Sequence, residues 1–249
     1  MKHSAQKLQD RQRKARDIVA KSFRNQNIDL IDAQQSAFTA LASMLERRLG
    51  EEVQGISEAD QGSISLIAQF VVGIEQCKIS IEEGLYAQAA ALLKQELETV
   101  SAIEEYRDDR RKEGKTPKIG HGLTQNYGKV YGRLNEICHP SRHDWAKTLV
   151  VQKIETVTGA NILAVYNGQI ARFLYGQHVI YLDMIVQLSD EILYKLYGCS
   201  MNSQEIEWAF ITKMLLASGG IVASPPELAE DLANWRTNYL KNRNDKTSG

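Results

Sequence analysis

The chain has few of the features that mark secreted, membrane-spanning or strongly charged proteins. Only three of its 249 residues are cysteines, widely spaced and odd in number, so neither a disulfide framework nor a cysteine zinc site is expected. The formal net charge is only −1, so the overall charge of the protein does not attract it to nucleic acid or to a membrane. No uncharged run reaches the roughly 18–20 residues of a membrane span. We therefore expect a soluble, cytoplasmic protein without a membrane partner or secretory signal.

Proline is also scarce, and its distribution favours helices. The four prolines all lie outside the long segments of helical periodicity. Apolar residues recur there at three- and four-residue spacing, as on the buried faces of helices. This pattern predicts an all-α fold, a multi-helix bundle of seven or eight helices. β-Branched residues around a turn at Thr158-Gly159-Ala160-Asn161 allow one short β-hairpin near 150–166.

The first predicted helix, over residues 2–24, is rich in lysine and arginine. It contains eight basic and two acidic residues, together with a thin apolar stripe. Such a helix is either an arm for nucleic acid or a partner, or an ordinary helix with a solvated face. With the next helix it gives a basic N-terminal helical hairpin over 1–50. The main helical bundle then follows over 51–249, in one continuous domain.

Capping residues mark the starts of several other helices. Ser57, followed by acidic residues, begins one helix, and Ser80 is predicted to begin the next, over 81–112. Asn202 with Glu205 three residues later predicts a capped helix start. The other predicted helices span 29–49, 123–138, 167–197 and 225–241.

The segment from Arg133 to His139, followed at once by Pro140, has the clearest indication of chemistry. Arginine keeps its charge and histidine titrates near neutrality, so together they can cleave a phosphodiester without a metal. At about 100° per residue, Arg133, Glu136 and His139 share one side of the helix. The opposite side is a predicted core stripe of Tyr127, Tyr131, Leu134 and Cys138. Alternatively, His139 only complements the helix dipole and Arg133 pairs with Glu136.

This segment resembles the signature of the HEPN superfamily (higher eukaryotes and prokaryotes nucleotide-binding domains), an arginine followed after four to six residues by a histidine. Many members have a polar residue directly after the arginine, whereas this chain has Leu134 there and Asn135 next. The chain also resembles a group of helical bacterial proteins over roughly 80–195. That likeness is carried by Ala89 to Glu98, Tyr131 to Ser141 and Ala171 to His178.

The HEPN resemblance implies a metal-independent endoribonuclease or RNA-binding protein without a cofactor, of a bacterial toxin–antitoxin or antiviral defence system. His139 would move the proton of the attacking 2′-hydroxyl or the leaving oxygen, and Arg133 would hold the phosphate. Asn135 and Glu136 would support this pair, and His143 is a candidate second proton carrier. The implied partners are RNA, a second copy of the chain, and a partner or antitoxin protein.

A charged stretch near the motif supplies candidate RNA contacts, and together with 2–24 it is predicted to form a positive surface. These contacts are Arg107, Arg110, Arg111, Lys112, Lys115 and Lys118. His178 lies in an apolar stripe and is predicted to be a core histidine. The competing interpretation is a non-catalytic helical interaction or regulatory module, in which Arg133 and His139 are structural. A small-molecule-binding bundle has no specific residue in its favour.

Overall fold

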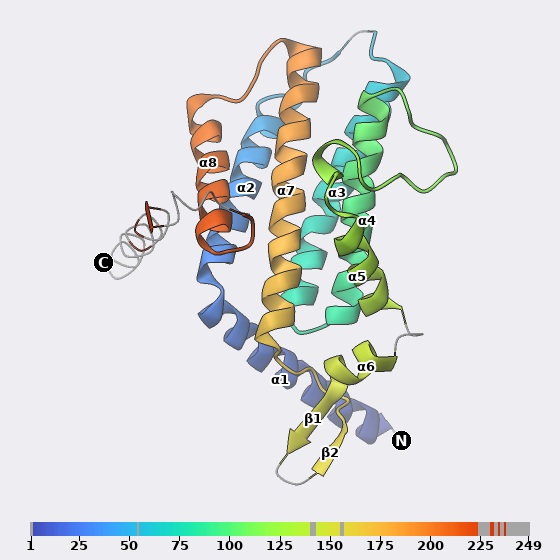
Figure 1. The fold of residues 1–249 in the computed structure, drawn as a ribbon, viewed down its shortest axis with the longest axis vertical. Helices are drawn as coiled ribbons and strands as arrows, with labels where there is room; N and C mark the ends of the chain where they lie inside the picture. The colour runs from blue at the N-terminus through green and yellow to red at the C-terminus, as the bar shows by residue number, and fades with distance from the viewer. Residues whose placement is uncertain are drawn as a thin grey trace. The chain divides into compact units, whose positions relative to one another are not determined.

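The computed structural model describes residues 2–53, 55–139, 143–154 and 157–223, with 230, 231, 234 and 237 beyond them. These residues form an all-α multi-helix bundle with one short hairpin, which confirms the predicted fold class (Figure 1). Of the helix predicted over 225–241, residues 230, 231, 234 and 237 are described, and they are helical. The rest of that helix lies outside the described residues. The elements are α1 (Lys2–Gln26), α2 (Ile28–Glu46), α3 (Glu58–Glu82), α4 (Tyr86–Arg107), the 3-10 turn η1 (Gly122–Thr124), α5 (Gly128–Cys138), α6 (His143–Val150), β1 (Val151–Ile154), β2 (Val157–Ala160), α7 (Gly168–Tyr197) and α8 (Ser203–Ser218).

The chain divides into two compact units, each discontinuous in sequence. The first unit contains residues 1–27 and 57–178, and the second contains 28–56 and 179–249. α7 is one unbroken helix whose first part belongs to the first unit and whose remainder belongs to the second. The two units are defined by contacts in space. The division predicted from the sequence, 1–50 and 51–249, was instead made along the order of the chain.

In the first unit, α4 packs against both α3 and α5 (Figure 1). The apolar residues that recur at helical spacing along α4 form its buried face, with Leu93, Leu97 and Val100 all at 0% exposure. Ile67 and Ile74 of α3 are buried as well. Burying side chains of this size contributes about 1.5–3 kcal/mol each, so this layer supplies much of the unit's stability.

The basic helix α1 belongs to the same unit through one packed face. Phe23 is completely buried, and its ring lies near that of Tyr175. Arg24 forms an ion pair of 3.0 Å with Glu82, whose side chain is almost buried. Part of the positive charge of α1 is therefore neutralised within the unit.

The boundary between α3 and α4 differs from the prediction. Ser80 does not cap a helix, because α3 continues through it and its hydroxyl donates to the Gln76 carbonyl at 2.8 Å. The helix ends at Glu82, and Gly84, two residues later, has a φ of +77°. The Leu85 and Gly84 amides donate to the carbonyls of Ser80 and Ile81, as in a Schellman motif. The glycine was the local signal for this helix end.

In the second unit, α2 packs against α8. The predicted start of α8 is confirmed, since Asn202 and Glu205 form a capping box. Glu205 is also completely buried, and Arg47 donates to its two carboxylate oxygens at 2.9 and 2.6 Å. The Ser43 hydroxyl donates to the same carboxylate at 2.7 Å. One glutamate thus caps α8 and joins it to α2.

The single predicted hairpin is present as β1 and β2, an antiparallel pair running from Val151 opposite Ala160 to Ile154 opposite Val157. The predicted turn was wrong, because Thr158, Gly159 and Ala160 belong to the second strand. Ile154 pairs with Val157, and the two residues between them lie outside the described ones. β-Branched residues on both sides of the glycine favour the strand over a turn.

Among the described residues, α3 is the one helix long and apolar enough to cross a membrane by length and composition. One third of its most apolar window is buried within the fold, where it packs against α4. Length and composition of a single helix are weak evidence of a membrane protein. The expectation of a soluble chain is retained, and its cytoplasmic location stays a prediction.

Candidate functional site

The motif helix α5 is shorter than predicted and buries a different stripe. It begins at Gly128, after the 3-10 turn, and ends at Cys138. Leu134 and Ile137 are its buried residues, while Tyr131 and Cys138 of the predicted stripe are only partly buried. Tyr131 lies at the border because its hydroxyl donates to Glu98 of α4 at 2.6 Å. Burial and this carboxylate raise the pKa of Tyr131 to about 12, so the phenol keeps its proton near neutrality.

Arg133 is exposed, and aromatic rings hold its guanidinium. Its central carbon lies 4.5 Å from the ring centre of Phe173 and 5.5 Å from that of Trp145. The Trp145 indole N–H in turn donates to Glu136 at 3.3 Å. A guanidinium stacked on aromatic faces keeps its N–H groups directed outward for an anion. Residues of α5, α6 and α7 therefore combine to orient one arginine.

His139 stands just past the end of α5 and is exposed. Its backbone is extended, with φ −91° and ψ 123°, as expected for a residue that precedes proline. It lines a cleft of about 440 Å³. The other walls of this cleft come from residues 84–88, 149–150 and 161–165, with Ile137 and Cys138 beside the histidine.

The structure places Arg133 and His139 in different surroundings. Arg133 is not among the residues that line the cleft beside His139. The two residues are six positions apart, which corresponds to about 9 Å along a helix axis. Glu136, which the sequence placed between them, contacts the Trp145 that supports Arg133. Arg133 and His139 were predicted to share one helix face. In the structure Arg133 instead stacks on two aromatic rings, and His139 lines a cleft.

Asn135 and His143 were the other two residues predicted to support the Arg133 and His139 pair. Asn135 is exposed, and its side-chain oxygen accepts from Lys94 of α4 at 3.2 Å. The Lys94 ammonium also lies 5.2 Å from the ring centre of Tyr131, so Asn135 helps to join α5 to α4. His143 begins α6, and its side chain lies outside the described part of the chain.

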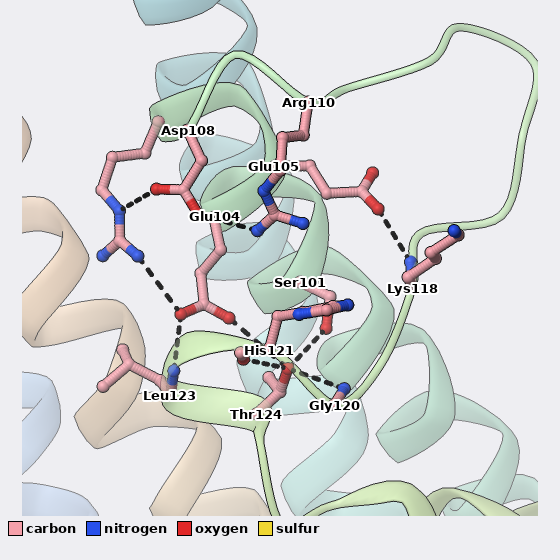
Figure 2. Close-up of polar contacts among 11 residues, drawn as sticks. Ser101, Glu104, Glu105, Asp108, Arg110, Lys118, Gly120, His121, Leu123 and Thr124 are labelled. Carbon is pink, nitrogen blue, oxygen red and sulfur yellow. Dashed lines mark hydrogen bonds and ion pairs between the residues drawn. The ribbon is translucent and has the colours of Figure 1, made fainter.

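The arginines predicted to contact RNA after α4 are paired with acidic groups. Arg107 pairs with Asp108 at 3.1 Å, and Arg110 pairs with the same carboxylate at 2.7 Å (Figure 2). Arg111 pairs with Glu105 at 3.4 Å and is only 17% exposed. These three arginines stabilise their own loop. Arg107 and Arg110 stay exposed in spite of these pairs, and Lys112, Lys115 and Lys118 are exposed as well.

Two adjacent glutamates of α4 hold this loop in place, as Figure 2 shows. Glu104 accepts from the Leu123 amide at 2.6 Å, and the Thr124 hydroxyl lies 3.4 Å from its other oxygen. Glu105 accepts from the Lys118 amide at 2.8 Å. Burial raises the pKa of Glu104, although the Leu123 amide and Arg107 oppose that shift. The loop that leads into the motif helix is therefore fixed from within the fold.

A buried group of chemically active residues was missed by the sequence analysis. Cys77, Glu96 and His178 come from α3, α4 and α7, and their ligand atoms lie within 4.8 Å of one another. His178 is a core histidine, as predicted, with 0% exposure. No spacing motif could reveal the group, because each helix supplies one member and the last two are 82 residues apart.

Comparisons with protein-family models, with curated proteins and with solved structures gave no match. The resemblance of the motif to HEPN proteins therefore stays a prediction. The functional argument rests on the geometry of α5 and of the residues around it.

Proposed function

We propose that this chain is an RNA-binding protein of the HEPN type that cleaves RNA without a metal. The observation that supports it is the exposed Arg133 guanidinium, stacked on Phe173 and Trp145. Arginine in this arrangement offers several outward N–H donors to a phosphate, and the neighbouring rings suit stacking with unpaired bases. Such a platform fits single-stranded RNA better than it fits an internal ion pair.

His139 is proposed as the proton carrier. It is exposed at the end of the same helix, and histidine is the side chain that most often carries protons in catalysis. In cleavage it would take the proton of the 2′-hydroxyl while Arg133 stabilises the charge on the phosphate. The separation of the two side chains favours a dimer, in which Arg133 and His139 of two copies serve one RNA strand. The chain would act in a bacterial toxin–antitoxin or antiviral defence system, where a partner protein restrains it.

The decisive experiment is to incubate the purified full-length chain with total RNA, with and without EDTA. We expect His139→Ala and Arg133→Ala to lower cleavage by about 100-fold or more, the usual contribution of such groups, while circular dichroism stays that of the parent. Arg133→Lys keeps the charge but lacks the flat stacking group, so it should also bind RNA weakly. His121→Ala, at another exposed histidine, is the matched control and should cleave normally.

Three results would overturn the proposal: no cleavage by the parent chain, normal cleavage by His139→Ala, or unfolding of both variants. Unfolding would make the pair structural. Sedimentation at tens of micromolar tests the dimer in the same samples, and a monomer there would contradict it.

A second candidate function follows from the cleft beside His139. Most of its lining is apolar, including Ile137, Leu149, Val150 and Leu163. An apolar groove of this kind suits a peptide segment of a partner protein, which is the non-catalytic interaction module of the sequence analysis. Binding of a partner that is weakened by Leu163→Glu, without any RNA cleavage, would favour this candidate.

A further inference from the structure

The interior of the first unit holds three side chains that ligate metals, brought together from three helices. Cys77 of α3 is 1% exposed, Glu96 of α4 is 7% exposed, and His178 of α7 is 0% exposed. Their ligand atoms all lie within 4.8 Å of one another. Ionisable groups are rarely buried unless something compensates for the lost solvation.

The contacts within this cluster leave it incompletely satisfied. The His178 Nδ1 lies 3.0 Å from both oxygens of Glu96, equidistant between them. The Cys77 sulfur lies within 4.8 Å of the ligand atoms of both other residues. His178 Nε2 is buried and has no hydrogen-bond partner among the described residues. Its nearest aromatic neighbour, the Tyr175 ring, meets it edge-on and offers no bond to that nitrogen.

Within the described part of the chain, the pairing of Glu96 is confined to the cluster, where its carboxylate forms an ion pair with His178 when that imidazole is protonated. Among the described residues, no lysine or arginine forms an ion pair with Glu96. A carboxylate and a thiolate together carry two negative charges, which a divalent ion would balance. The His178 Nδ1 and the Glu96 oxygens form a hydrogen-bonded pair at 3.0 Å, and they are close enough together to become ligands of one ion in the tautomer that carries the proton on Nε2.

A cavity beside the cluster supplies both access and room. It has a volume of about 210 Å³, and Cys77 and Glu96 form part of its wall. Gln69 and Thr99 line it with polar groups, and Phe70 lines it with an apolar one. Water or a small anion in this cavity could reach an ion held by the three side chains.

We propose that Cys77, Glu96 and His178 form a binding site for a divalent transition-metal ion of the zinc class. Sulfur and imidazole ligands favour zinc and its neighbours, whereas magnesium and calcium prefer oxygen alone. Zinc holds such ligands at about 2.0–2.3 Å, so the three side chains draw together slightly around it. The fourth position faces the cavity. The ion joins α3, α4 and α7, and it takes no part in the metal-independent cleavage proposed for Arg133 and His139.

Binding changes the protonation of the cluster. Burial, with Glu96 next to it, raises the pKa of the Cys77 thiol well above its usual range, so the metal-free protein holds a protonated thiol. When the ion binds, the thiol proton leaves to solvent and a metal–sulfur bond forms in its place. No oxidation or reduction takes place.

The test is a cobalt titration of metal-free, full-length protein without RNA, followed by displacement with zinc. We expect one cobalt ion per chain, with the intense visible bands of a tetrahedral site and a thiolate-to-cobalt band in the near ultraviolet. Cys77→Ser should remove the thiolate band and weaken binding by about 100-fold or more, because it deletes a direct ligand. Cys138→Ser and Cys199→Ser, at the two cysteines outside the cluster, are the matched controls and should bind normally.

The proposal is overturned if no stoichiometric cobalt binds, or if the thiolate band persists in Cys77→Ser. Should Cys77→Ser fail to fold, X-ray absorption by the zinc-loaded parent chain decides the question. One sulfur ligand beside nitrogen and oxygen ligands supports the site, and a shell without sulfur rejects it. None of these measurements depends on cleavage of RNA.

Discussion

A single buried carboxylate organises the approach to the motif helix. Glu104 lies on α4, yet one of its oxygens accepts from the Leu123 amide, and Arg107 forms an ion pair with the same oxygen at 3.6 Å. This arrangement requires a close approach of the chain at Gly122, where φ is +49°. A Cβ at that position would collide with the carboxylate oxygen of Glu104. At the scale of one residue, glycine is therefore required both by its backbone conformation and by the space available.

We expect Gly122→Ala to lower the free energy of unfolding by about 2 kcal/mol, because it combines a strained backbone with the loss of a buried hydrogen bond. Urea unfolding followed by circular dichroism measures the change. Gly132→Ala is the control, since Gly132 lies in α5 with open space around it. That substitution should stabilise the chain by about 0.5–1 kcal/mol. Equal effects at the two positions would contradict this account of the loop.

At the scale of elements, Glu205 joins two helices through one side chain. It accepts from the Asn202 amide at the start of α8 and from Arg47 and Ser43 of α2. Burial alone would raise its pKa, but these three donors outweigh burial and lower it. The ionised form is therefore the one that the folded chain prefers.

The sign of this shift predicts a loss of stability in acid. A lowered pKa in the folded state gives stabilisation that is present above the unfolded value of about 4.3 and lost as the pH falls through the folded pKa. Glu205→Gln should cost about 2–3 kcal/mol at pH 7, and less at pH 3. Denaturant unfolding of both chains at each pH measures the difference. Glu207→Gln, at an exposed glutamate of the same helix, should change stability at neither pH.

Sequence motifs predicted helix starts correctly where the structure depends only on residues a few positions apart. The capping box of α8 and the Ser57 cap of α3 depend on residues within three positions, and both are present. Ser80 failed as a predicted cap because a serine hydroxyl can equally bond back to its own helix. The turn of the hairpin failed for a similar reason, since glycine is tolerated in an edge strand.

At the scale of the whole molecule, the fold class was predictable and the sites were only partly so. Helical periodicity repeats within each segment, so it needs no knowledge of tertiary contacts. The exposure of Arg133 and His139 also followed from the pattern of α5. Their surroundings did not, because Trp145 and Phe173 come from other helices. The Cys77 cluster is the extreme case, with one ligand from each of three helices.

The distribution of charge over the molecule gives a prediction for RNA binding. Replacing Lys112, Lys115 and Lys118 by alanine should weaken RNA binding and make its salt dependence shallower. In a plot of log binding constant against log salt concentration, the slope should change by about 0.7 for each phosphate of single-stranded RNA that a lysine no longer neutralises. Filter binding across a salt series measures the slope. Arg111→Ala should mainly lower stability, because that side chain is paired with Glu105. A slope unaffected by the three lysine substitutions would remove this surface from the proposed interface.

The adjacent Glu104 and Glu105 have one more consequence, for how the loop after α4 can vary. Both ends of its exposed middle, between Arg111 and Lys118, are fastened to Glu105. Residues inserted between these anchors add only a slowly growing entropy of loop closure and leave the entry to α5 in place. A change in length here would therefore move Lys112 and Lys115 without moving α5, so the lysines of the proposed RNA surface can be varied separately from the motif helix.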